Sequence, residues 1–144
     1  MSWDVYIMRV PQDVEEVEDI PGGWEPPSLG MVGEVREVLV EQLPGIVFDN
    51  DGRGEYDGPG FRIGIPLPGN DSEEVEMVAL FVHGGGDAAG AALAVTEALG
   101  ARAIETGNGG WLTAETAAEA FNAWQTYRDR VVRGDEVTDT TEST

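Results

Sequence analysis

The segment Asp49–Asp57 has the residue types and part of the spacing of a calcium-binding loop. Such loops place oxygen ligands at positions 1, 3, 5, 9 and 12. Counted from Asp49, positions 1, 3 and 9 are Asp49, Asp51 and Asp57. Position 5 is Arg53, a cation, and the bidentate glutamate of position 12 is missing. These three aspartates are therefore weak metal candidates, and an acidic, turn-rich hairpin loop explains the segment better.

The string His83-Gly84-Gly85-Gly86 matches the oxyanion-hole sequence of some esterases. Those enzymes also need a nucleophile elbow, G-x-S-x-G, followed by an acid and a second histidine. None of the four serines lies in such a context, and His83 is the only histidine. The segment also lacks the Lys and Ser/Thr of a phosphate-binding loop. We interpret it as a glycine-rich turn between a strand and a helix.

His83 by itself could act as a general base beside a carboxylate. A zinc site is disfavoured, because one histidine and no cysteine leave only carboxylates as further ligands. The sequence therefore indicates no cofactor and favours a non-enzymatic role. The alternative left open is a small carboxylate-based enzyme or divalent-metal binder that uses the Asp49–Asp57 loop or His83.

The charge of the chain is the strongest chemical signal. Its 144 residues carry 28 Asp and Glu, and all eight basic residues are arginines, which gives a net charge of −20. Such a chain repels nucleic acid and anionic membranes and attracts basic proteins. Two origins of the acidity remain open: a functional acidic surface, or the background composition of a GC-rich or salt-adapted genome.

One acidic cluster has the features of a contact surface for a basic partner. It precedes an aromatic residue in a Pro-Gly loop, a combination in which the carboxylates attract the partner and the ring supplies contact area. The candidate partner-binding residues are Asp13, Glu15, Glu16, Glu18, Asp19 and Trp24. The alternative is that Trp24 folds back onto the core, as we expect for Trp3, Trp111 and Trp124.

The periodicity of apolar residues predicts the elements that position these groups. Strands are expected at residues 2–10, 61–67, 75–83 and 101–106, with an optional short strand at 46–48. The strand at 75–83 is apolar on both faces, which is typical of a central strand. Helices are expected near 28–43, 87–99 and 113–132, with Ser28, Asp87 and Thr113 as N-caps. The sequence thus predicts an α+β fold: a mostly antiparallel sheet of four to five strands with about three helices packed on one face.

The length predicts a single globular domain over residues 1–134, followed by a disordered acidic tail at 135–144. No apolar run reaches the ~20 residues of a membrane-spanning helix, and the amino terminus does not match a signal peptide. With no cysteine, the chain needs no particular redox compartment. We expect a cytoplasmic protein without membrane or nucleic-acid partners.

Several segments, WDVYIMR, DIPGGWEPPSLG, GPGFRIGI, GGGDAAG and GARAIET, together resemble an uncharacterised family of small acidic actinobacterial proteins. The resemblance covers roughly residues 1–133. That group is similar in style to the immunity proteins of bacterial toxin systems, which are small, acidic, cysteine-poor α+β domains that neutralise basic toxins. The resemblance supports the origin and the α+β fold class more than the function, and no catalytic residue is carried over from it, because none is known for that group.

Overall fold

The computed structural model describes residues 2–107 and 109–133, and the side chains up to residue 130. The expected tail at 135–144 lies outside the described residues. The described chain folds into eight strands, three α-helices and one 3-10 turn. The strands are β1 Trp3–Met8, β2 Gly30–Met31, β3 Val47–Phe48, β4 Gly54–Gly58, β5 Phe61–Ile65, β6 Glu74–Val75, β7 Val78–Gly84 and β8 Arg102–Glu105. The helices are η1 Val17–Asp19, α1 Val32–Gln42, α2 Ala88–Ala98 and α3 Ala117–Arg133.

Six strands form one fully antiparallel sheet in the order β3-β4-β5-β7-β1-β8, and β2 pairs with β6 in a separate two-stranded sheet. The α+β class and the antiparallel arrangement are therefore confirmed, and the sheet has more strands than the four to five expected. As its apolar faces predict, β7 is a central strand. The amino-terminal strand β1 lies between β7 and β8.

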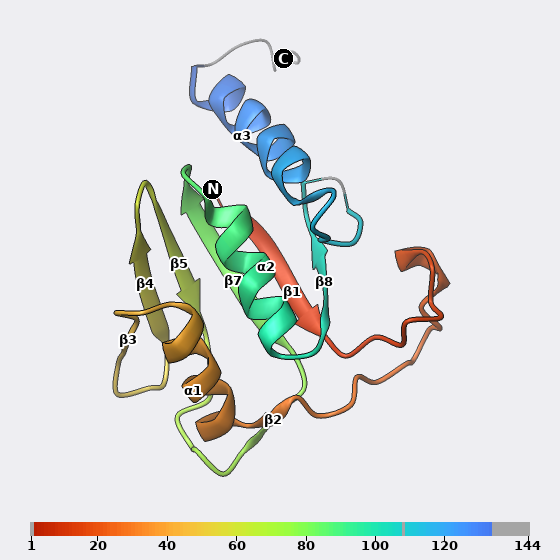
Figure 1. Ribbon diagram of the computed structural model, residues 1–144, viewed down its shortest axis with the longest axis vertical. Helices are drawn as coiled ribbons and strands as arrows, with labels where there is room; N and C mark the ends of the chain where they lie inside the picture. The colour runs from red at the N-terminus through yellow and green to blue at the C-terminus, as the bar shows by residue number, and fades with distance from the viewer. Residues whose placement is uncertain (1, 108, 134–144) are drawn as a thin grey trace.

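The helices cover one face of the sheet, with α2 lying along β7 and β1, as Figure 1 shows. β1 follows its predicted alternation, since Trp3, Val5 and Ile7 are fully buried and the residues between them are half-buried. The Trp3 ring meets Phe121 of α3 with ring centroids 4.8 Å apart. The core thus lies between this face of the sheet and the helices, and the opposite face of the sheet carries no helix.

The strand β4 corrects the expectation that the segment Asp49–Asp57 is a loop, because its residues from Gly54 onward are in a strand. Its outward residues are Glu55 and Asp57. Tyr56 is one of its three inward residues, and glycines occupy the other two inward positions. A Cβ at Gly58 would lie 2.3 Å from Cζ of Phe61, and one at Gly54 would lie 2.8 Å from the ring of Phe48. Aromatic rings fill the space above these glycines, so Tyr56 is the only apolar side chain that the strand itself contributes to its inward face.

The first helix also begins later than predicted, at Val32 instead of after Ser28. Its first two N–H groups donate to carbonyls of the segment just before β6. Val32 N donates to Glu73 O at 2.8 Å, and Gly33 N donates to Asp71 O at 3.2 Å. The Ser28 hydroxyl instead accepts the N–H of Gly30. Because carbonyls of the turn before β6 accept these N–H groups and Glu34 Oε1 accepts the N–H of Met31, no serine cap is needed at the helix start.

Candidate functional site

The acidic segment between β1 and β2 is held against β8 by one arginine. Arg102 Nη1 donates to the carbonyls of Pro11 and Val14, both at 2.8 Å. The same guanidinium lies over the ring of Trp111, 3.8 Å from its centroid. A guanidinium suits this position, because it donates in its plane while its face stacks on an aromatic ring. We call Arg102 and Trp111 the loop clamp.

The indole of Trp111 completes the clamp, since its Nε1 donates to the carbonyl of Glu15 at 2.9 Å. Trp111 forms an antiparallel bridge with Ile104 beside β8 and is half-buried. The expectation that it belongs to the core was therefore wrong. Trp3 and Trp124 are core residues, at 0% and 6% exposure. What separates them is that the indole N–H of Trp111 has a backbone acceptor at the surface.

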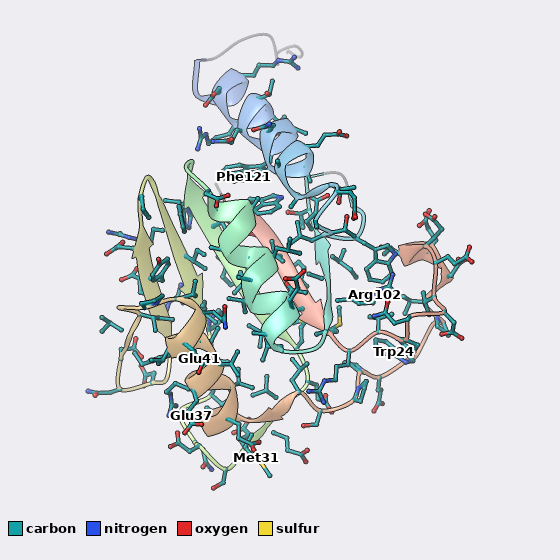
Figure 2. All side chains as sticks on the ribbon, viewed as in Figure 1. Trp24, Met31, Glu37, Glu41, Arg102 and Phe121 are labelled. Carbon is teal, nitrogen blue, oxygen red and sulfur yellow. The ribbon has the colours of Figure 1, made fainter. Side chains whose placement is uncertain are left out.

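The clamp fixes the backbone of the segment while its carboxylates point outward. Each of the five predicted contact acids is exposed: Asp13, Glu15, Glu16, Glu18 and Asp19. The turn η1 adds local order, because Asp19 Oδ2 accepts the N–H of Glu16 at 3.3 Å. Trp24 is half-buried and lies on the same side of the molecule as Arg102 (Figure 2). We call residues 11–24 the acidic loop.

The arginines whose side chains are described form ion pairs with only three of the described carboxylates. Arg9, Arg102 and Arg128 donate to backbone carbonyls and thereby hold loops in place. Within the described part of the chain, the carboxylates in ion pairs are Asp57, Asp71 and Asp129. No described cation pairs with a carboxylate of the acidic loop. The loop therefore presents uncompensated negative charge on a fixed backbone.

Two of the three aspartates of the calcium-like segment, Asp49 and Asp57, have separate structural tasks. Asp49 Oδ1 accepts the N–H groups of Asp51 and Arg53 and so closes the turn after β3. Asp57 lies in β4, where its Oδ1 accepts from Arg62 Nε at 2.7 Å. That hydrogen bond and the charge of Asp57 raise the pKa of Arg62. Among the described residues, no group of three or more His, Asp or Glu is placed to hold a metal ion.

His83 is an exposed residue of β7, opposite Arg62 of β5. It lines a surface groove of about 670 Å³ together with Glu55, Asp57 and Arg62. The glycines after it form the predicted turn into α2, and Gly84 and Gly86 have φ of 99° and 62°. Asp87 caps α2 as expected, because its side chain accepts the N–H of Gly90.

Sequence reasoning missed one buried acid. Glu105 is 1% exposed and ends β8 on the helix-covered face. Its Oε1 accepts Trp3 Nε1 at 2.9 Å and the N–H of Gly107 at 2.6 Å. The sequence did contain a signal for this buried acid. Glu105 follows Ala103 by two residues in the strand, so both side chains lie on the same inward face. These bonds tie the end of β8 to β1, so we assign Glu105 a structural role.

Comparison with known proteins identifies no function for this arrangement of residues. No family model matches the chain, and neither a curated protein nor a solved structure shows significant similarity to it. In the described residues, no helix is both long and apolar enough to span a membrane. The function is therefore inferred from charge, burial and contacts alone.

Proposed function

We propose that this protein is a non-enzymatic binding domain whose acidic loop docks on a basic protein partner. The observation that carries the proposal is the loop clamp. Arg102 and Trp111 fix the carbonyls of Pro11, Val14 and Glu15, and the carboxylates around them stay exposed. The clamp holds the loop backbone in place, so the carboxylates that the loop carries are presented in a fixed arrangement.

Preorganised negative charge favours such a partner for two physical reasons. Complementary charge accelerates the encounter between the two proteins and suppresses partners of the same sign. A loop that is already ordered loses less conformational entropy when it binds. Trp24, half-buried at the end of the loop, supplies an aromatic contact beside the carboxylates.

We further propose an immunity-like role, in which the partner is a basic toxin and the contact blocks its active surface. The small size, the absence of cysteine, the net charge of −20 and the α+β fold agree with this role. It implies a cytoplasmic protein that binds neither nucleic acid nor a membrane. The alternative, a carboxylate-based enzyme or metal binder, has the groove beside His83 in its favour, where Asp57 and Arg62 also lie.

Site-specific photo-cross-linking in the organism that encodes the protein tests the proposal. A photoreactive residue replaces Gln12, which is exposed in the acidic loop, or Tyr127, which is 55% exposed on α3. We expect the loop position to capture a protein of basic isoelectric point that the α3 position does not capture. The yield should fall with salt, because the attraction is between exposed charges.

Charge-reversal variants distinguish the contribution of the acidic loop to binding from that of the net negative charge of the chain. Replacing Glu15, Glu16 and Glu18 by lysine should abolish the cross-link. Replacing three exposed glutamates elsewhere changes the net charge equally and should leave it in place; suitable positions are Glu37, Glu41 and Glu74 (the first two are labelled in Figure 2). The proposal fails if both triple variants behave alike, or if the captured protein is acidic.

A further inference from the structure

A pocket of about 470 Å³ lies between α1, the end of α2 and the segment that leads into β2. The two helices lie side by side on the covered face of the sheet (Figure 1). The volume is within the range of about 300–1,000 Å³ that is typical of small-molecule sites. The described residues that line the pocket belong neither to the acidic loop nor to the loop clamp. We call it the helix pocket.

Five of the nine residues that line the helix pocket are apolar: Leu29, Val35, Val38, Ala98 and Leu99. Leu29, Val35 and Leu99 are buried members of the core, and Val38 is half-buried beside them. The pocket is therefore backed by the core. An apolar group placed against these side chains is removed from water, which favours binding.

The cation of the helix pocket is Arg9, which has no ion-pair partner in the part of the chain that the structure describes. Its Nη1 donates to the carbonyl of Ser28 at 3.0 Å, and its Nη2 donates to the carbonyl of Leu99 at 3.3 Å. These two bonds fix the guanidinium and use two of its five N–H donors, so three are left for a ligand. A fixed guanidinium fork is well suited to a carboxylate.

The anion of the helix pocket is Glu34, an exposed residue in the first turn of α1. Its Oε1 accepts the N–H of Met31 at 2.9 Å, and this bond orients the carboxylate. No described residue donates a hydrogen bond to its second oxygen, Oε2. A carboxylate oxygen of this kind accepts from an ammonium group. The pocket thus offers one group for a negative charge and one for a positive charge.

From these two charges and the apolar lining we infer that the helix pocket binds a free amino acid with an apolar side chain. The carboxylate of the ligand pairs with Arg9, its ammonium group pairs with Glu34, and its side chain contacts Val35, Val38 and Leu99. The net charge of −20 favours this class of ligand. The chain repels an anion, whereas a zwitterion has no net charge to be repelled. A cation, in turn, leaves Arg9 without a partner.

This inference does not depend on the acidic loop or on the proposed basic partner. It assigns no reaction to the helix pocket. Because the ligand has few atoms, we expect weak binding, with a Kd of about 1 mM.

Nuclear magnetic resonance titration of the full chain tests the inference. The probes are leucine and phenylalanine, raised to about 20 mM in about 0.15 M salt, which screens the net charge. The amide signals of Val35, Val38 and Leu99 should shift and reach saturation. Absence of a saturable shift at these amides with either amino acid would overturn the inference.

Three analogues each remove one of the proposed contacts. N-acetylleucine lacks the ammonium group, leucinamide lacks the carboxylate, and glycine lacks the apolar side chain. We expect each to bind at least tenfold more weakly than leucine. Leucinamide that binds as tightly as leucine would also overturn the inference, because general attraction of cations to an acidic chain would then explain the binding.

Two variants locate the contacts, each with a control that makes the same charge change elsewhere. Arg9→Gln and Glu34→Gln should weaken leucine binding at least tenfold, whereas Arg130→Gln on α3 and Glu37→Gln on α1 change exposed residues and should leave it unchanged. The pocket variants should also change the discrimination between probes. Glu34→Gln should bind leucine and N-acetylleucine equally, and Arg9→Gln should bind leucine and leucinamide equally. A purely structural disturbance would weaken all probes alike, so discrimination that persists in both variants would refute the assignment.

Discussion

Replacing Arg102 by methionine should release the acidic loop without unfolding the domain. Arg102 makes two hydrogen bonds to the carbonyls of Pro11 and Val14 and stacks on Trp111. A hydrogen bond from a charged donor contributes about 1.5–3 kcal/mol, and a cation–π contact about 1 kcal/mol. The low end of these ranges gives about 4 kcal/mol. Arg102 is half-buried and water can replace it at the carbonyls, so we halve this to a net loss of about 2 kcal/mol.

Amide hydrogen exchange measures this loss directly, because it reports local opening. Three amides of the loop are hydrogen-bonded inside it: Val14 N to Pro11 O, Asp19 N to Glu16 O, and Ile20 N to Val17 O. A loss of about 2 kcal/mol should speed their exchange roughly 30-fold. The amides of the central strands should be unaffected, since no clamp contact reaches them.

Two further variants sharpen the assay. Arg102→Lys keeps the charge but loses the planar fork, so its loop amides should exchange at an intermediate rate. Arg130→Met removes an arginine of α3 for which no hydrogen bond or ion pair is found among the described residues, and loop exchange should not change. Unchanged loop exchange in Arg102→Met would refute the clamp and, with it, the observation on which the proposed function depends.

Other expected outcomes concern the charge, the buried acid and the lone histidine. Raising NaCl from about 0.02 to about 0.3 M should raise the Tm measured by differential scanning calorimetry, because salt screens the repulsion among the carboxylates of the chain. A flat or falling Tm would mean that local ion pairs outweigh the net charge. Glu105→Ala should lower the free energy of unfolding by about 3 kcal/mol in urea titrations, because Trp3 and Gly107 lose their acceptor. Glu105→Gln should cost less, because its amide oxygen can still accept both of these bonds; equal losses would contradict this role. His83→Ala should change stability by no more than about 0.5 kcal/mol, since the side chain is exposed; a loss of biological activity at unchanged Tm would favour the enzymatic alternative.

The elements with strong apolar periodicity were predictable from the sequence. The alternation in residues 2–10 gave β1 and its buried face, and the two-sided apolar run at 75–83 predicted that β7 is central. The exposed carboxylates of residues 13–19 were also identifiable, because a stretch so rich in acids and poor in apolar residues has nothing to bury.

β4 and the start of α1 escaped prediction for a common reason. Two of the three inward positions of β4 are glycines, and the space above them is filled by rings of Phe48 and Phe61, which lie outside that strand. The first two N–H groups of α1 donate to backbone carbonyls of residues 71 and 73. In both cases the decisive group belongs to another segment, and a local pattern carries no information about it.

The sequence by itself determined the fold class, the faces of the principal strands and helices, and the excess of negative charge, because each depends on residue types and their spacing. Only the tertiary structure decided where the arginines are used and which sheet face stays uncovered. Arg102 could have paired with any of 28 acids, yet it bonds two carbonyls about ninety residues away. Every residue but proline offers the same carbonyl and N–H, and proline offers the carbonyl. The choice among such acceptors is therefore set by the path of the folded backbone and not by the side chains along it.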